Sequence, residues 1–190
     1  EFYMNLPNKL ATLRMILVIP FVIFLGIALS TESTGLSIFM RILSFVIFAG
    51  ASITDYFDGQ IARKHNMVTN LGKLIDPLAD KLLVISALVV LTKYDQISLW
   101  FVLIIIFREL LITGLRAIVA NEGVVIAAEK LGKWKTATQM IALLLIILFP
   151  MSFFVNNILL LIPVILTVQS GVEYMQKAKN IPVSYTHLTL

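Results

Sequence analysis

The sequence predicts an all-α integral membrane protein with six transmembrane helices. Hydrophobic residues make up 59% of the chain and charged residues only 14%, and the mean hydropathy is +0.95. Soluble domains are about 45–50% apolar and about 25% charged, so this composition excludes an ordinary water-soluble domain. A chain of 190 residues suits one domain, which in a bilayer takes the form of a helix bundle.

The second observation is a series of long apolar runs. A helix needs about 20 apolar residues to cross a hydrocarbon core of about 30 Å. Runs of this length predict spans at about 8–29, 37–58, 73–93, 97–119, 134–150 and 154–175. The first run is longer than the apolar part of a signal peptide and lacks a small-residue cleavage site, so we expect it to remain as a span.

The third observation is the uneven distribution of basic residues. All but two of the 15 Lys and Arg residues fall on one side of the predicted bundle, the exceptions being Arg41 and Lys93. Loops 30–36, 94–96 and 151–157 carry no Lys or Arg. The positive-inside rule therefore predicts a protein of the cell membrane with both termini in the cytoplasm. The modest net charge of +4 indicates topology signals and anionic ligands rather than nucleic acid.

Four aspartates, Asp55, Asp58, Asp76 and Asp80, form the central polar group of the sequence. The first pair is three residues apart at the end of the second span, and the second pair is four apart at the start of the third. Each pair therefore shares a helix face. Because the connecting loop is short, we expect the two helices to be antiparallel neighbours. The four carboxylates would then converge at the inner edge of the membrane.

Carboxylates at this depth need a compensating charge, because acidic side chains in a bilayer are costly. Oxygen ligands suit Mg²⁺, Mn²⁺ or Ca²⁺, and four carboxylates are enough for two cations about 3.5–4 Å apart. Such a pair of cations clamps a diphosphate. A single aspartate at a helix end is usually a cap, but four of them at helical spacing favour a metal site.

Small and basic residues lie between the aspartates. Gly59 allows a ligand to approach the backbone, and Ala62 keeps the same face small. Arg63 offers a planar fork suited to phosphate. We expect Gly72 to allow the turn before the third helix.

The stretch from Asp55 to Asp80, DYFDGQIARKHNMVTNLGKLIDPLAD, matches the pattern D-x2-D-G-x2-A-R-x8-G-x3-D-x3-D at every specified position. It thereby resembles the CDP-alcohol phosphotransferase family. The resemblance extends over about residues 4–179, the predicted domain, and residues 1–3 and about 183–190 are expected to be non-native additions. It implies a six-helix bundle, usually a homodimer, that transfers a substituted phosphoryl group from a CDP-linked donor to an alcohol and releases CMP.

The same resemblance implies roles for the motif residues. The principal ligands of two Mg²⁺ or Mn²⁺ ions would be Asp55, Asp58 and Asp76. Asp80 would be the general base and a ligand near the second ion. The residues that seat the CDP donor would be Asp55, Asp58, Gly59, Ala62, Arg63 and Gly72.

Polar residues outside the motif predict a phosphate-binding pocket for the acceptor alcohol. This set is Thr12, Arg14, Lys81, Arg108, Arg116, Lys133 and Lys135. The alternative for each basic residue taken alone is a snorkelling anchor or a lipid-headgroup contact, and it is weaker for Arg108 and Arg116, which lie among apolar neighbours. Arg108, Glu109 and Arg116 are expected at the cytoplasmic end of the fourth span, where Glu109 and Arg116 share a helix face and form a candidate ion pair.

The branch of the family that uses sn-glycerol 3-phosphate is similar in three stretches, NLPNKLATLRMILVIPF, FRELLITGLR and LGKWKTATQ. This similarity implies transfer of the phosphatidyl group from CDP-diacylglycerol, a membrane lipid, to sn-glycerol 3-phosphate, giving phosphatidylglycerol phosphate. The same chemistry on inositol phosphate, serine, choline or phosphatidylglycerol stays an alternative.

Two other classes of membrane protein also use clustered aspartates. A membrane prenyltransferase binds a diphosphate through two aspartate motifs that lie far apart in the sequence, whereas these aspartates are close together. A divalent-cation transporter would place carboxylates near mid-membrane and often shows two related halves. Here the carboxylates lie near one face, and no convincing internal repeat is present.

Overall fold

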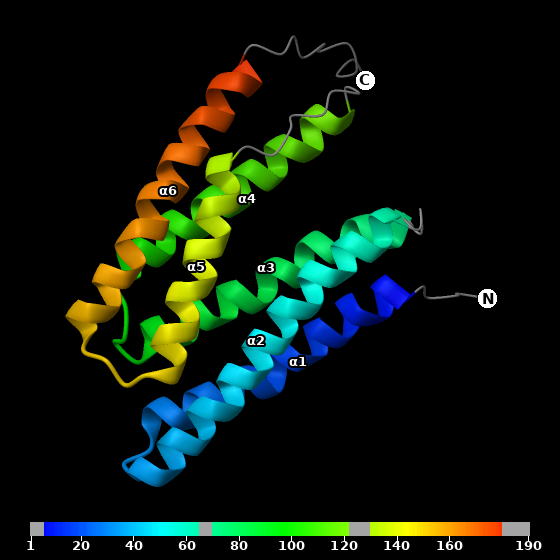
Figure 1. The fold of residues 1–190 in the computed structure, drawn as a ribbon. Helices are drawn as coiled ribbons and strands as arrows, with labels where there is room; N and C mark the ends of the chain where they lie inside the picture. The colour runs from blue at the N-terminus through cyan, green and yellow to red at the C-terminus, as the bar shows by residue number, and fades with distance from the viewer. Residues whose placement is uncertain (1–5, 65–69, 122–129, 180–190) are drawn as a thin grey trace, which may run out of the picture. The chain divides into compact units, whose positions relative to one another are not determined.

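The computed structural model describes residues 6–64, 70–121 and 130–179. These residues form six α-helices and short connections (Figure 1), and none of them forms a β-strand. The helices are α1 (Leu6–Ser30), α2 (Thr34–Lys64), α3 (Asn70–Lys93), α4 (Leu99–Asn121), α5 (Lys130–Leu148) and α6 (Phe153–Lys179). The predicted six-helix, all-α fold is confirmed. The largest difference is in α2, which continues to Lys64 although its apolar run ends near residue 58.

Four of the helices contain stretches long and apolar enough to cross a membrane. Within the described residues these are Lys9–Ser30, Thr34–Thr54, Leu131–Leu148 and Phe153–Lys177. Large apolar side chains on their surfaces are exposed, for example Ile19 by 63% and Phe154 by 72%. Extended apolar surfaces of this kind are covered by lipid in membrane proteins. The chain is therefore a multi-pass membrane protein.

The chain forms two compact units. The first consists of Glu1–Gln96 and Leu143–Phe153, and thus holds α1, α2, α3 and the end of α5. The second consists of Ile97–Ala142 and Phe154–Leu190, and thus holds α4, most of α5 and α6.

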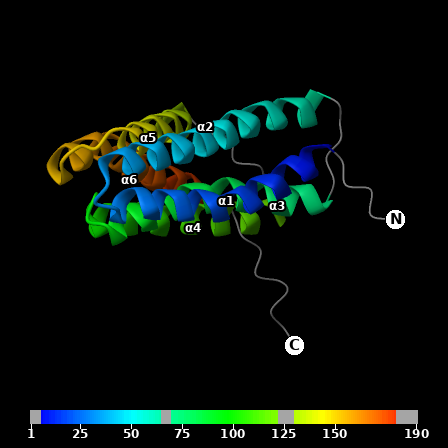
Figure 2. The same cartoon turned by 90° about the horizontal axis from the view of Figure 1, so that it is seen from below.

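In the first unit, α1 packs along both α2 and α3 (Figure 2), whereas α2 and α3 have few contacts with each other among the described residues. The chain runs in opposite directions along α2 and α3. The buried core includes Phe21 and Leu25 of α1, Phe48 of α2 and Leu83 of α3, and the Phe21 and Phe48 rings lie 5.6 Å apart. The predicted antiparallel direction is confirmed, but α1 supplies most of the contact that was expected directly between α2 and α3.

Arg41 of α2 joins that helix to the end of α5. Its side chain is buried, and its Nη1 donates to the carbonyl oxygens of Ile146, Ile147 and Phe149 at 3.2, 3.0 and 3.5 Å. The last carbonyls of a helix lack partners inside the helix, and a positive charge is favourable at that end. Arg41 therefore acts as a capping residue between two segments of the first unit.

A Schellman motif ends α3. Asp95 has a φ of 51°, its N–H donates to Thr92 O at 3.1 Å, and the N–H of Gln96 donates to Leu91 O at 2.9 Å. These two bonds satisfy carbonyls at the helix end while one residue adopts the left-handed conformation. The helix is thus stopped within a few residues of Lys93.

Candidate functional site

The aspartate motif lies on the end of α2 and the start of α3. The backbone of Asp55, Asp58, Gly59, Ala62 and Arg63 forms the last turns of α2, and that of Gly72, Asp76 and Asp80 lies in the first turns of α3. The side chains of these residues lie outside the described part of the structure. The helical backbone confirms that each aspartate pair has the spacing of a shared helix face.

Helix length agrees with the expected position of this motif near the membrane edge. The segment Thr34–Thr54 of α2 has 21 residues, which is about 31 Å of helix and already covers a hydrocarbon core of about 30 Å. Asp55 and the residues after it are not needed to cross the core. The expectation that Gly72 lies in a turn before the third helix is wrong, because α3 begins at Asn70 and Gly72 lies in its first turn. Its predicted role at the CDP donor stays a prediction.

The donor set of the motif suits hard divalent cations. It consists only of carboxylates, in helical pairs on two segments that are consecutive in the chain, and Mg²⁺ and Mn²⁺ prefer such oxygen ligands. Among the side chains that the structure describes, no group of three His, Cys, Asp or Glu residues could hold a metal ion. Metal binding by the aspartate motif stays a prediction that rests on its donor set.

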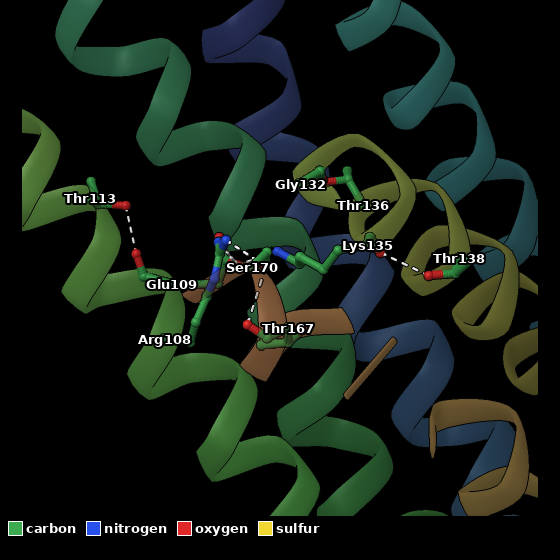
Figure 3. A network of polar contacts seen from close by, with 9 residues as sticks. All are labelled: Arg108, Glu109, Thr113, Gly132, Lys135, Thr136, Thr138, Thr167 and Ser170. Atoms are coloured by element: carbon green, nitrogen blue, oxygen red, sulfur yellow. Dashed lines mark hydrogen bonds and ion pairs between the residues drawn. The ribbon is translucent and has the colours of Figure 1, made fainter. Parts of the chain in front are cut away.

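A second polar cluster lies in the other unit and joins α4, α5 and α6 (Figure 3). Lys135 reaches from α5 to Glu109 of α4, and its Nζ donates to Glu109 Oε1. The Nη1 of Arg108 donates to the same oxygen at 3.2 Å. The Nη2 of Arg108 donates to Ser170 Oγ of α6 at 2.8 Å, and Ser170 Oγ donates to Thr167 O at 3.2 Å.

The three charged side chains of this cluster are largely withdrawn from solvent. The side chain of Lys135 is 6% exposed, and those of Arg108 and Glu109 are each 14% exposed. One carboxylate is shared by two cations, so the three side chains together carry a formal surplus of positive charge. Charge-assisted hydrogen bonds from Arg and Lys are the usual means of binding phosphate and carboxylate. The cluster is therefore suited to an anionic ligand.

Gly171 of α6 makes room for Arg108. A Cβ atom at Gly171 would lie 3.2 Å from Arg108 Cγ, closer than ordinary van der Waals contact. Glycine weakens a helix, and here it allows the stem of Arg108 to pass close to α6. Neither Ser170 nor Gly171 was predicted from the sequence, although small residues inside an apolar helix are a signal of helix contact in membranes.

The structure changes two expectations for α4. Arg108 and Glu109 lie near the middle of the helix, because it begins at Leu99 and ends at Asn121. The expected Glu109–Arg116 pair is wrong, because seven residues separate the two by about 10.5 Å along the helix axis. Arg116 instead lies over the ring of Tyr174, with its Cζ 5.3 Å from the ring centroid.

The remaining predicted acceptor residues lie on α5 outside this cluster or in the first unit. Lys133 is exposed on α5. Thr12 and Lys81 are half-buried and Arg14 is buried, and all three belong to the first unit. The structure therefore brings Arg108 and Lys135 together, through Glu109, and the phosphate-binding role of the whole set stays a prediction.

The sequence profile of the CDP-alcohol phosphatidyltransferase family matches residues 4–169. The chain belongs to this family. The resemblance inferred from the aspartate pattern is thereby confirmed. Members of the CDP-alcohol phosphatidyltransferase family are membrane enzymes that generally depend on divalent cations.

Several curated relatives are similar over most of their length. The chain is 41% identical over 185 residues to the CDP-diacylglycerol–glycerol-3-phosphate 3-phosphatidyltransferase of Bacillus subtilis. The alignment covers 91% of this chain and 94% of the relative. The chain is 40% identical over 182 residues to the protein of the same name from Rickettsia typhi, covering 93% and 98%. It is also 37% identical over 177 residues to a probable phosphatidylglycerophosphate synthase of Mycobacterium tuberculosis, covering 92% and 81%.

Proposed function

We propose that this family member transfers the phosphatidyl group from CDP-diacylglycerol to sn-glycerol 3-phosphate, giving phosphatidylglycerol phosphate and CMP. The observation that carries the proposal is the 41% identity to the Bacillus subtilis enzyme of that name across 94% of its length. The aspartate pattern supplies the chemistry for this reaction, and the α4–α5–α6 cluster supplies a candidate site for an acceptor phosphate.

The donor diphosphate would lie at the aspartate motif. Asp55, Asp58, Asp76 and Asp80 would hold two divalent cations, Mg²⁺ or Mn²⁺, which when bound neutralise charge on the diphosphate. Around them, the backbone at Gly59 and Gly72, the small side chain of Ala62 and the guanidinium of Arg63 would seat the CDP group.

In the proposed reaction, Asp80 takes the proton from the primary hydroxyl of glycerol 3-phosphate. The hydroxyl oxygen attacks the phosphorus that bears the diacylglycerol group and forms a new phosphorus–oxygen bond. The bond from this phosphorus to the oxygen shared with the CMP phosphate breaks, and CMP leaves with the electron pair. Arg63 offsets the negative charge that CMP gains.

The phosphate of the acceptor would bind to basic residues of the predicted set. Arg108 and Lys135 are the best supported, because both are largely buried and share one carboxylate. Thr12, Arg14, Lys81, Arg116 and Lys133 are the other members of the proposed phosphate-binding set. A phosphate dianion there would offset the surplus positive charge of the cluster.

The proposed reaction joins a lipid to a water-soluble alcohol, so its site must be reached from both phases. An aspartate motif at the membrane edge satisfies this requirement. The excess of Lys and Arg on the same side supports a cytoplasmic site in the cell membrane. We include a homodimer in the proposal on the family resemblance.

An acceptor panel tests the function. Purified protein with CDP-diacylglycerol and Mn²⁺ or Mg²⁺ would be given glycerol 3-phosphate, inositol phosphate, serine or phosphatidylglycerol, and CMP release would be followed. We expect release only with glycerol 3-phosphate, and none after chelation of the cation or in the Asp80→Asn variant. Faster release with another alcohol would contradict the acceptor, and near wild-type turnover by Asp80→Asn would contradict the assigned base.

A further inference from the structure

The hydroxyl of Thr167, on α6, is buried without a hydrogen bond in the described part of the structure. A Ser or Thr hydroxyl inside a helix can donate to the carbonyl oxygen four residues before it. In the described helices this bond is made by Ser44, Ser52, Thr54, Thr92, Thr113, Thr136 and Thr138. Thr167 does not make it: the residue is 0% exposed, and its Oγ1 has no partner among the described residues.

A buried hydroxyl without a hydrogen bond lowers the stability of the folded protein. Valine has nearly the same shape as threonine and no polar atom, so it would fill this position without that loss. Buried polar atoms in proteins nearly always have a partner. The hydroxyl of Thr167 is therefore explained if it gains its partner when a ligand binds.

Thr167 lies beside the α4–α5–α6 cluster (Figure 3). It comes three residues before Ser170 and four before Gly171, so these residues share one face of α6. The carbonyl oxygen of Thr167 accepts from Ser170 Oγ at 3.2 Å, and the same Oγ accepts from Arg108 Nη2 at 2.8 Å. These bonds engage Ser170 and the backbone of Thr167, and they leave the Thr167 hydroxyl available to a ligand of the cluster.

Arg108 carries a second polar atom of this kind. Its Nη1 and Nη2 donate to Glu109 and Ser170, whereas its Nε is buried and has no partner within the described ranges. A guanidinium N–H can only donate, but a hydroxyl can both donate and accept. The cluster thus offers donors to an anion and, at Thr167, a hydrogen-bond partner to an alcohol.

Glycerol 3-phosphate carries an anion and an alcohol on neighbouring carbons. Its secondary hydroxyl is on the carbon next to the one that bears the phosphate, and the primary hydroxyl that reacts is at the other end. A phosphate bound by Arg108 and Lys135 would therefore keep the secondary hydroxyl close to the cluster. A buried hydrogen-bonding group discriminates strongly against an analogue that lacks the matching hydroxyl, because the buried group is then left unpaired.

We propose that Thr167 is a specificity-determining residue, whose hydroxyl hydrogen-bonds the secondary hydroxyl of glycerol 3-phosphate while Arg108 and Lys135 bind its phosphate. The proposal rests on the proposed function. Thr167 selects the acceptor without taking part in the chemical step, because the hydroxyl that it contacts is not the one that attacks phosphorus.

The test removes the hydroxyl from the side chain and from the substrate in turn. Thr167→Val removes it from the protein, and 3-hydroxypropyl phosphate is glycerol 3-phosphate without its secondary hydroxyl. The kcat/KM for each acceptor would be measured by CMP release at saturating CDP-diacylglycerol. We expect wild type to favour glycerol 3-phosphate over the analogue by about tenfold or more. Thr167→Val should lower kcat/KM for glycerol 3-phosphate about tenfold and leave the value for the analogue unchanged.

Two more variants control for side-chain shape and for the loss of any hydroxyl. Thr167→Ser keeps the hydroxyl and should retain the preference for glycerol 3-phosphate. Thr92→Val removes a hydroxyl that donates to Leu88 O of its own helix at 2.8 Å, and it should change neither kcat/KM. A Thr167→Ser protein that has lost the preference would overturn the proposal.

Equal falls in kcat/KM for both acceptors in Thr167→Val would mean that the hydroxyl serves the fold or a buried water, and would overturn the proposal. Wild-type protein that uses the two acceptors equally well would also overturn it, and this result does not depend on the folding of any variant. Wild-type protein that releases CMP with another alcohol but not with glycerol 3-phosphate would instead refute the proposed function itself.

Discussion

Replacing Glu109 by Gln keeps the shape of the side chain but removes the charge that both Lys135 and Arg108 contact. Removing one partner of a buried ion pair costs about 3–5 kcal/mol, and the side chains of Glu109 and Lys135 are only 14% and 6% exposed. Because the Gln amide oxygen still accepts a hydrogen bond, we expect the free energy of unfolding to fall by about 2–3 kcal/mol. For a chain of this size the Tm should then fall by about 4–12 °C.

A double-mutant cycle with Lys135→Met isolates the pair. Lys135→Met removes one of the two cations, so the Glu109→Gln/Lys135→Met double variant should regain at least half of the loss caused by Glu109→Gln alone. Thermal unfolding in detergent, followed by tryptophan fluorescence, gives the Tm of each variant. Losses that simply add in the double variant, or a Glu109→Gln protein as stable as wild type, would refute the reasoning.

Two further variants test the close contact between Gly171 and Arg108 and the hydrogen bonds of Arg41. Gly171→Ala places a Cβ 3.2 Å from Arg108 Cγ, so we expect the KM for glycerol 3-phosphate to rise about threefold to tenfold and the KM for the donor to stay unchanged. The control is Gly114→Ala, because a Cβ at Gly114 meets nothing within 4 Å. Equal effects of the two variants would contradict the role of Arg108. Arg41→Met removes the hydrogen bonds to three carbonyls at the end of α5 and should lower the free energy of unfolding by about 2–3 kcal/mol, measured as Tm, without changing either KM. Lys177→Met removes an exposed ion pair with Glu173 at 3.9 Å and should cost less than about 1 kcal/mol. A loss as large as that of Arg41→Met would remove the distinction between cap and surface charge.

The helices could be predicted from the sequence because each depends on a local apolar run. The end of α2 could not be predicted in this way. Hydropathy falls near residue 58, but the backbone hydrogen bonds continue to Lys64 through residues such as Gln60, Ala62 and Arg63, which favour helix. Membrane crossing and helix formation are different requirements, and the length of the apolar run indicates only the first.

Partners of single charged side chains were harder to predict than helices. Arg41 bonds to carbonyls 105 to 108 positions further along the chain, and no local pattern indicates such a cap. Glu109 was assigned to Arg116 on its own helix face, but a side chain of another helix, Lys135, comes closer than a residue two turns away. The motif aspartates were recognised because their spacing is local, and the geometry of their side chains stays a prediction.

Arg41 and the cluster of Arg108, Glu109 and Lys135 are charged groups inside apolar helices, and their charges have different explanations. A charge within a membrane span is costly and needs a compensating interaction. For Arg41 this is found in the protein, since its bonds go to helix-end carbonyls that lack partners inside their helix. Among the three charged side chains of the described cluster, one carboxylate contacts two cations. We propose that this surplus serves an anion that binds and leaves, because the positive charge must remain tolerable in the empty enzyme and favourable for the ligand. Partial neutralisation by Glu109 meets both conditions, and this favours the cluster, rather than the exposed basic residues, as the place where the acceptor phosphate binds.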